Sequence, residues 1–132
     1  MGAIPLSLVD FVKDKIALIG DAAGMVKPYT GGGIYYLLRA AELLGDFFPN
    51  LIGFKKRYLK EFKGEYVVGE KIRKLYQILN DKDYEFLVKL SKDIDFSNVD
   101  MDRPSTALNI IPKLVKMAKR PKIIFEMVRA FL

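Results

Sequence analysis

The chain contains no cysteine, no histidine and no tryptophan in its 132 residues. Without cysteine it cannot form a disulfide framework or a thiolate zinc site. Without cysteine and histidine it cannot carry a Ser-His or Cys-His nucleophile pair of its own. Asp95, Asp100 and Asp102 lack the glycine and the final glutamate of a calcium loop, so we expect no metal site. Any chemistry on this chain must therefore be supplied by a cofactor or by another polypeptide segment.

The chain also lacks a long hydrophobic run. None of its apolar stretches reaches the roughly 18 residues of a membrane span, and its first residues do not show the charged and apolar regions of a signal peptide. We therefore expect a cytoplasmic protein, and peripheral contact with a membrane stays open. The length leaves room for one hydrophobic core, and the hydrophobic content of 51% is too high for a disordered chain.

Hydrophobic periodicity predicts an α+β fold that is mostly helical, with two short strands, a glycine-rich turn and then about five helices. The strands are expected at Ala3–Leu6, where Pro5 suits a sheet edge, and at Lys15–Ile19, a continuous apolar run typical of a buried strand. The first helix is expected from about Gly32 to Leu44. Its inward face is predicted to be an apolar stripe of Ile34, Leu37, Leu38, Ala41 and Leu44.

The second half of the chain is helical by pattern. In Leu51–Leu79 we expect a bend or a break at Gly64 or Gly69, and one face carries Phe54, Tyr58, Phe62 and Tyr66. Asn80 and Asp81 are expected to cap a further helix, whose inward residues would be Tyr84, Leu87, Val88 and Ser91. A loop over Ile94–Arg103 should precede two last helices, which start near Ser105, with an interruption at Pro112, and at Pro121.

These elements predict two regions. Residues 1–45 hold the strands, the glycine-rich turn and the first helix, and residues 46–132 form a helical tail. Two strands cannot form a stable sheet by themselves. We therefore expect the strands to belong to a larger sheet that sequence outside this chain completes.

The most informative feature is the string GDAAGMVKPYTGGGI, which we call the glycine-rich segment (Gly20–Ile34). It follows an apolar run and leads into the first predicted helix. A helix start presents N–H groups without intrahelical partners and the positive end of the helix dipole. Gly31, Gly32 and Gly33 have no side chains to keep a ligand away from these amides, and the carboxylate of Asp21 can accept hydrogen bonds from sugar hydroxyls. Fixed amides of this kind can stabilise an electron-rich ring edge.

The glycine-rich segment resembles the second flavin-binding motif, the GD motif, of FAD-dependent oxidoreductases related to p-hydroxybenzoate hydroxylase. The amino-acid sequence of the motif is most similar to that of the geranylgeranyl reductases of archaeal and plant lipid metabolism. The resemblance implies that Asp21 binds the ribityl chain of FAD, that the amides of Gly33 and Ile34 approach the flavin ring, and that Pro28 shapes the turn beside it. The implied cofactor-binding set is completed by Gly20, Ala22, Gly31 and Gly32. It leaves the catalytic residue unknown.

One departure from the family pattern is clear. The family binds the adenosine end of FAD with a Gly-x-Gly-x-x-Gly turn near its N-terminus, and no such turn occurs in this sequence. The resemblance therefore implies a C-terminal portion, with an incomplete FAD site and a missing N-terminal FAD-binding half, which is inactive alone. The implied function is reduction of carbon–carbon double bonds in an isoprenoid lipid. The alternatives are a fragment of a flavin monooxygenase, or a non-catalytic basic helical module that binds a membrane or a protein partner.

Charge and aromatic residues suggest further partners. Residues 53–76 hold eight basic against three acidic residues, which fits a solvated helix face, and we do not expect nucleic acid binding. The basic residues of 113–122 could lie on a membrane surface or on a plain helix pair. Unpaired strand edges and exposed apolar surface favour a homo-oligomer. Aromatic residues that could line a substrate tunnel, or simply form core, are Tyr35, Tyr36, Phe54 and Tyr58.

Overall fold

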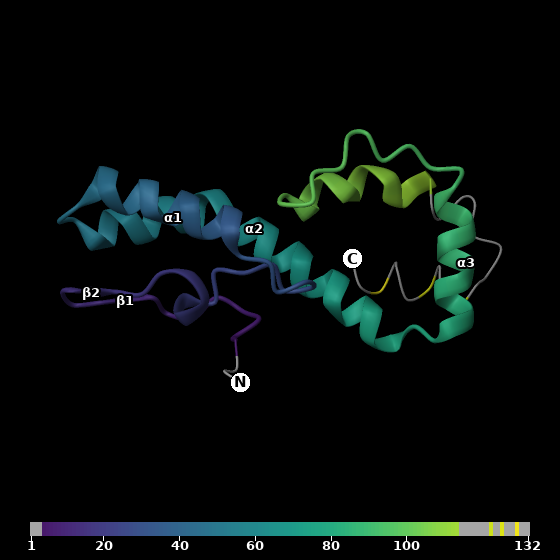
Figure 1. Cartoon of the computed structure of the whole chain (residues 1–132), viewed down its shortest axis with the longest axis horizontal. Helices are drawn as coiled ribbons and strands as arrows, with labels where there is room; N and C mark the ends of the chain where they lie inside the picture. The colour runs from purple at the N-terminus through teal and green to yellow at the C-terminus, as the bar shows by residue number, and fades with distance from the viewer. Residues whose placement is uncertain (1–3, 114–121, 123–124, 126–128, 130–132) are drawn as a thin grey trace. The chain divides into compact units, whose positions relative to one another are not determined.

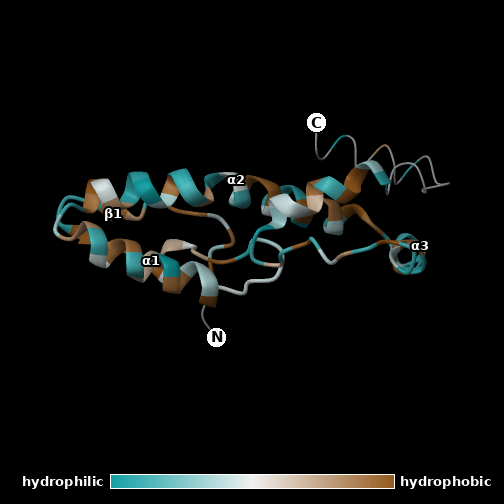
Figure 2. Cartoon of the chain, turned by 90° about the horizontal axis from the view of Figure 1, so that it is seen from above, coloured by the Kyte–Doolittle hydropathy of each residue, from teal (hydrophilic) through white to brown (hydrophobic). Residues whose placement is uncertain are grey.

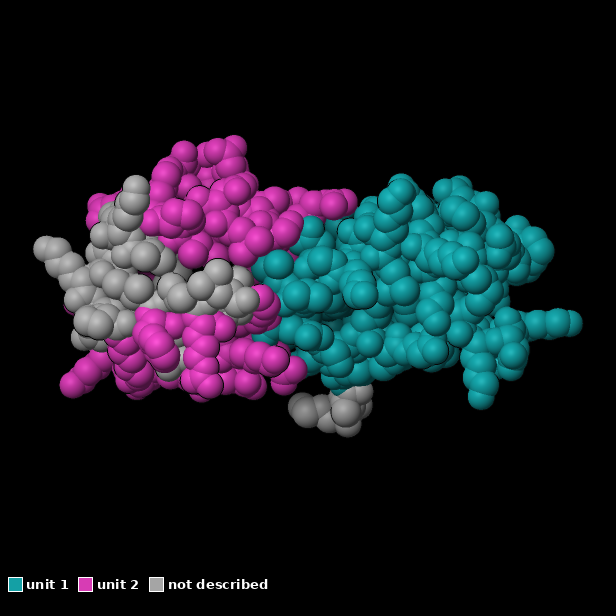
Figure 3. Space-filling model, turned by 180° about the vertical axis from the view of Figure 1, so that it is seen from behind, with its two compact units in different colours: residues 1–70 teal, residues 71–132 magenta. Residues whose placement is uncertain are grey.

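The computed structural model of the chain describes residues 4–113, 122, 125 and 129. Contacts divide it into two compact units, residues 1–70 and residues 71–132 (Figure 3). The glycine-rich segment lies wholly in the first unit. The described part is mostly helical and has a single two-stranded antiparallel sheet, so the predicted α+β class is confirmed.

The first unit begins with a short hairpin of β1 (Val12–Lys13) and β2 (Ile16–Ala17), in which Val12 pairs with Ala17. The helical turn η1 (Gly20–Ala23) follows, and then α1 (Ile34–Phe47) and the long α2 (Leu51–Ile78), whose residues after 70 belong to the second unit. Within the unit, α1 runs alongside the first part of α2 (Figures 1 and 2). The glycine-rich segment thus connects the hairpin to the start of α1.

Aromatic side chains form the core of the first unit. The face of α2 that was predicted to carry aromatic residues is buried, as are Tyr36, Ala40 and Leu43 of α1 and Phe11, which precedes β1. The rings meet edge-on or tilted, with centroids 5.5 Å apart for Phe11 and Tyr58 and 5.0 Å apart for Tyr36 and Phe62. Such pairs add about 0.5–1.5 kcal/mol each beyond the area they bury. The aromatic spacing along α2 therefore holds α1 and the hairpin segment together.

An ion pair reinforces the contact between the two helices. The guanidinium of Arg39 on α1 donates to both carboxylate oxygens of Glu61 on α2, at 3.0 and 3.1 Å, and also to Glu42 at 2.9 Å. A planar guanidinium and a carboxylate bond in this paired way with a fixed orientation. The pair therefore fixes which face of α1 turns toward α2.

The predicted strands differ from those observed. The described residues of the first one, 4–6, form no strand, and the second shrinks to Ile16–Ala17. The prediction that the second strand is buried is wrong, because Ile16 is 66% exposed and Leu18 is 40% exposed. A continuous apolar run becomes a buried strand only where other elements cover both faces. The described residues pair β2 with β1 alone.

The predicted helices are mostly confirmed, with shifted ends. The first begins at Ile34 and continues through Gly45 to Phe47. The second runs as one helix through Gly64 and Gly69, so the expected break is wrong. The predicted inward stripe of α1 is also wrong except at Leu44, which is partly buried and packs against the core. Ile34 is 79% and Leu38 is 61% exposed, and the buried residues lie on the opposite side of the helix.

In the second unit, Leu75 packs with Leu79, Phe86, Leu87 and Ile111. The predicted cap of α3 (Asp81–Ser91) is confirmed at Asn80, whose partner is Asp83 rather than Asp81: Asn80 Oδ1 accepts from the Asp83 N–H at 3.1 Å, and Asp83 Oδ2 accepts from the Asn80 N–H at 3.2 Å. Val88, at 63% exposure, and Tyr84, at 39%, were wrongly predicted to face inward. Buried on α3 are Asp83 and Leu90.

The chain after α3 follows the predicted loop into η2 (Pro104–Ile110) and a helical turn at 111–113. The predicted continuation after residue 113 and the start of the last helix at Pro121 lie outside the described residues. Within the part that the structure describes, no helix is both long enough and apolar enough to cross a membrane.

Candidate functional site

The glycine-rich segment is folded by close backbone contacts. Gly20 and Gly24 have φ values of 64° and 68°, in the left-handed region that glycine tolerates. A Cβ atom at Gly24 would lie 2.1 Å from the carbonyl oxygen of Ser7, so only glycine fits there. The N–H of Val9 donates to the Ala23 carbonyl at 3.2 Å. The turn is therefore fixed against the chain that precedes the hairpin.

The middle of the segment closes on itself. The Lys27 N–H donates to the Gly32 carbonyl at 2.9 Å, and the Gly31 N–H donates to the Lys27 carbonyl at 2.8 Å. The Gly32 N–H donates to Thr30 Oγ1 at 3.3 Å. The N–H groups of Gly31 and Gly32 are thus used inside the loop. Gly31, with φ at 75° and open space around it, supplies the reversal of the backbone.

Gly33 and Ile34 form the start of α1. Gly33 occupies the N-cap position and has no side-chain cap hydrogen bond. The first N–H groups of a helix have no intrahelical acceptor, so the amides of these two residues are the ones that can serve a ligand. A Cβ atom at Gly33 would meet Val26 Cγ1 at 3.0 Å and the Met25 carbonyl oxygen at 3.1 Å. Glycine is therefore needed for packing as well as for access.

Asp21 lies next to this helix start. Its Oδ1 atom is 3.5 Å from the place that a Cβ atom would take on Gly33. Asp21 and its neighbour Ala22 are exposed, as is Ile34, whereas Gly20 is buried. The structure thus brings together, at one exposed place, the carboxylate and the helix start that the sequence singled out. A carboxylate acceptor beside free N–H donors can bind a ligand that carries hydroxyls at one end and carbonyl oxygens at the other.

Pro28 anchors the loop to α2. It is fully buried, and its Cδ atom lies 2.8 Å from the place that a Cβ atom would take on Gly69. Tyr29 Cδ1 is 3.5 Å from the same point. Gly69 is a site residue that the sequence analysis missed, because it was interpreted only as a weak point in a helix. A buried glycine inside a long helix signals a close approach by another part of the chain.

The four aromatic residues predicted to line a substrate tunnel lie in or at the core. Tyr36, Phe54 and Tyr58 are buried and Tyr35 is half-buried, with its ring 5.8 Å from that of Tyr36 and 6.0 Å from that of Phe62. All four act as core residues in this chain. Their contact with a substrate stays a prediction.

The hydroxyls of Tyr58 and Tyr66 form a buried hydrogen bond of 2.9 Å. Burial raises the pKa of Tyr66 to about 12, although the hydrogen bond with Tyr58 opposes this rise. Burial likewise raises the pKa of Tyr58, and the neighbouring Tyr66 raises it further. Both hydroxyls therefore stay protonated near neutral pH and satisfy each other inside an apolar core.

Two hollows on the first unit have no lining residue within the glycine-rich segment. One, of about 380 Å³, is lined by residues of 8–11 and by one side of α2 that includes Lys55, Lys63 and Tyr66. The other, of about 420 Å³, lies at the junction of α1 and α2 beside Asp14 and Lys15. No metal-binding cluster of acidic side chains is present among the described residues. The helix start at Gly33 is thus the best-defined candidate site.

Comparison with known proteins gives relatives of much greater length. An uncharacterized protein of Methanocaldococcus jannaschii is 35% identical over 119 residues, which are 80% of this chain and 31% of that protein. Digeranylgeranylglycerophospholipid reductase 2 of Methanosphaera stadtmanae is 32% identical over 83% of this chain and 31% of its own. Digeranylgeranylglycerophospholipid reductase 1 of Methanothermobacter thermautotrophicus is 25% identical over 99% of this chain and 33% of its own.

The chain spans about a third of the length of the curated relatives it matches. No family model and no solved structure matches it. Four further archaeal proteins with the printed name digeranylgeranylglycerophospholipid reductase match it at 26–28% identity. The resemblance predicted from the glycine-rich segment is thereby confirmed: the chain is similar to archaeal digeranylgeranylglycerophospholipid reductases over about a third of their length.

Proposed function

We propose that this chain supplies the ribityl-binding and ring-binding part of an FAD-dependent reductase that saturates carbon–carbon double bonds in an isoprenoid lipid. The observation that carries the proposal is the exposed pair of Asp21 and the uncapped helix start at Gly33. The printed names of the relatives, digeranylgeranylglycerophospholipid reductases, support the lipid class and the reaction type.

Each residue of the pair has a distinct part in the proposal. The carboxylate of Asp21 accepts hydrogen bonds from hydroxyls of the ribityl chain. The N–H groups of Gly33 and Ile34 donate to the carbonyl end of the ring, where the positive end of the α1 dipole favours negative charge. Pro28, clamped on Gly69, holds the loop in place. Reduced FAD, when bound, would supply the hydride for reduction of a double bond, and a proton would complete the saturation.

The hydrogen-bonding groups of Asp21, Gly33 and Ile34 fit the ribityl and ring half of FAD. The described residues offer no second glycine-rich turn for the pyrophosphate and adenosine, and the sequence has none. In this proposal those groups are bound by the polypeptide that corresponds to the other two-thirds of the relatives, so the chain alone is inactive. The electron-accepting lipid and the rest of the site come from outside it.

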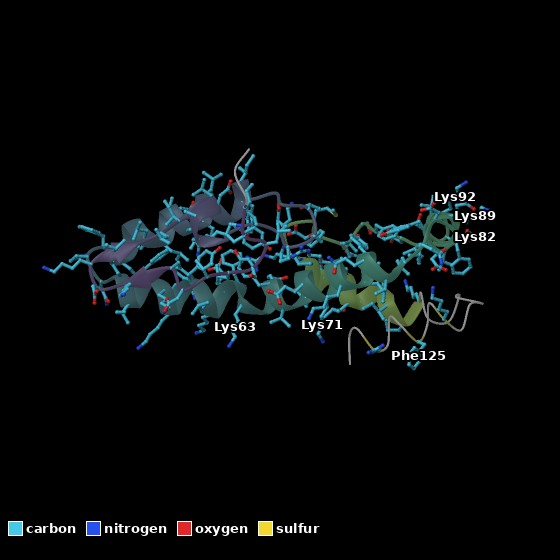
Figure 4. All side chains as sticks on the ribbon, turned by 90° about the horizontal axis from the view of Figure 1, so that it is seen from below. Lys63, Lys71, Lys82, Lys89, Lys92 and Phe125 are labelled. Atoms are coloured by element: carbon cyan, nitrogen blue, oxygen red, sulfur yellow. The ribbon has the colours of Figure 1, made fainter. Side chains whose placement is uncertain are left out.

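We propose that the protein acts in the cytoplasm on a lipid that it binds at a membrane surface. Lys82, Lys89 and Lys92 are exposed and lie around α3 in Figure 4. Lysines near a surface attract anionic lipid headgroups by about 1 kcal/mol each. Exposed Asp81, Glu85 and Asp93 lie among these lysines, so α3 has no excess of positive charge, and the basic residues of 113–122 remain the proposed membrane contact.

Product analysis tests the proposed reaction. In a chimeric reductase, this chain replaces the matching segment of the Methanosphaera stadtmanae protein, which is 32% identical to it. With reduced FAD and a digeranylgeranyl phospholipid, we expect mass spectrometry to show that the lipid gains two hydrogen atoms for each double bond that is saturated. The Asp21→Ala variant should lose this activity, and Asp46→Ala, which changes an exposed aspartate at the far end of α1, should keep it.

Other products would select the alternatives. A gain of oxygen in an aromatic substrate, with no saturation of the lipid, would indicate the monooxygenase. A chimeric reductase that binds neither FAD nor lipid, while an intact relative does both, would contradict the proposal and favour a non-catalytic module.

A further inference from the structure

Helix α1 is apolar on two opposite sides. One side is the buried face of Tyr36, Ala40 and Leu43, which packs on α2. The other side, which we call the outer stripe, consists of Ile34, Leu38, Ala41 and Gly45, spaced by three or four residues. All four are exposed, Ile34 at 79% and Leu38 at 61%. In Figure 2, hydrophobic colouring also lies along the edge of α1 that faces away from α2.

A helix that is hydrophobic on all sides is typical of a protein interior. The charged side chains of α1 do not interrupt the outer stripe: Arg39 bonds to Glu61 of α2, Glu42 lies at the margin, and Asp46 is near the end of the helix. Gly45 has open space around it, so a neighbour could approach the backbone there closely. The outer stripe is therefore built as a contact surface.

The hairpin extends this surface. Ile16, at 66% exposure, and Leu18, at 40%, belong to the same apolar run that leads into the glycine-rich segment. Beyond that run, Gly20 meets α1 directly, because a Cβ atom there would lie 3.3 Å from Leu37 Cδ1. Leu37 is 38% exposed and flanks the outer stripe. Leu37 thus lies against Gly20, which follows β2 in the chain, and Ile34 of the outer stripe lies at the helix start that holds the candidate cofactor site.

We infer that the outer stripe and the exposed side of β2 are the docking surface for the polypeptide that makes up the other two-thirds of the family members. The chain spans about a third of those relatives, so a large body of sequence is available to cover the patch. The patch borders Asp21 and Gly33, and the adenosine half of the cofactor must be held by that same body. The identity of the partner in this inference rests on the proposed function. The position of the docking surface rests on the exposure and spacing of its residues.

Thiol labelling tests the docking surface, and the absence of native cysteine makes it specific within this chain. Leu38→Cys reports on the outer stripe. Val88→Cys, on α3 and equally exposed at 63%, is the matched control. Each variant is labelled with iodoacetamide, alone and within the chimeric reductase, and mass spectrometry reads modification at the introduced site. Both should be modified rapidly in the chain alone. In the chimeric reductase, we expect modification of Leu38→Cys to slow at least about tenfold and that of Val88→Cys to stay unchanged.

Equal labelling of Leu38→Cys in the two settings would overturn the inference. Protection in the chain alone that grows with its concentration would also overturn it, because the occupant would then be a second copy. A far-ultraviolet circular dichroism spectrum identical to that of the unmodified chain shows that each variant is folded. Labelling is measured with and without FAD. Protection without FAD supports the docking surface even if the cofactor proposal fails.

Discussion

The contact between Pro28 and Gly69 predicts opposite effects for the same substitution at two glycines of α2. Replacing glycine by alanine inside a helix stabilises it by about 1 kcal/mol. At Gly64 a Cβ atom would meet nothing within 4 Å, so Gly64→Ala should stabilise the first unit by about 0.5–1 kcal/mol. At Gly69 the new atom would lie 2.8 Å from Cδ of the rigid Pro28 ring. Overpacking of this kind costs about 1–3 kcal/mol, so Gly69→Ala should be neutral or destabilising.

The observable is the difference between the two variants, about 1–3 kcal/mol in the free energy of unfolding. Equilibrium unfolding in urea would be followed by near-ultraviolet circular dichroism of tyrosine, since five of the seven tyrosines lie in residues 1–70. Adding Pro28→Ala should remove the penalty at Gly69 and leave Gly64→Ala unaffected. If Gly69→Ala stabilises as much as Gly64→Ala, the loop does not rest on α2 as described, and the anchoring of the candidate site is wrong.

Gly24→Ala should destabilise by about 2–5 kcal/mol in urea unfolding, because a left-handed φ and the nearby Ser7 carbonyl both oppose a side chain; a loss below 1 kcal/mol would contradict this geometry. Tyr58→Phe leaves the Tyr66 hydroxyl without its partner and should cost about 1–3 kcal/mol, and a double-mutant cycle with Tyr66→Phe should show coupling rather than additivity. Burial raises the pKa of Tyr66 to about 12, above its ordinary value of 10.0, so the native state retains this proton and stability should fall as pH rises from 10.0 toward 12, less steeply in the double variant. Asn80→Ala removes the capping box of α3 and should cost about 1 kcal/mol, measured as lost helical signal from the second unit on heating.

Strong local signals made part of the fold predictable. The aromatic residues of α2 recur at helical spacing with no competing face, and all four are buried. Asn80 and Asp83 stand three residues apart before an apolar run, which is the signature of a capping box, and both hydrogen bonds are present. In both places one arrangement satisfies the sequence.

The wrong predictions of buried residues occur where the sequence is compatible with two different buried faces. Helix α1 has apolar residues on both sides, so periodicity alone could not decide between Leu38 and Leu43 as core. The aromatic core and the Arg39–Glu61 pair made that choice, and both depend on residues more than 20 positions away. The apolar run at β2 likewise predicted a buried strand, and no element among the described residues buries it.

The residues of the candidate site could be predicted from the sequence, but the contacts of its backbone could not. The string of glycines indicated a helix start beside Asp21, and the structure places the two together. Sequence could not show that the amides of Gly31 and Gly32 bond within the loop, nor that Gly69 receives Pro28. Both depend on the three-dimensional path of the loop.

An FAD titration of the chimeric reductase tests the central claim most directly. Binding would be followed by quenching of flavin fluorescence in the unmodified protein, in Asp21→Ala and in the control Asp46→Ala. Loss of a hydrogen-bonded carboxylate should weaken FAD binding at least about tenfold in Asp21→Ala, whereas Asp46→Ala should bind as the unmodified protein does. Equal FAD affinity in all three proteins would contradict the assignment of Asp21 and the helix start at Gly33 as the flavin site.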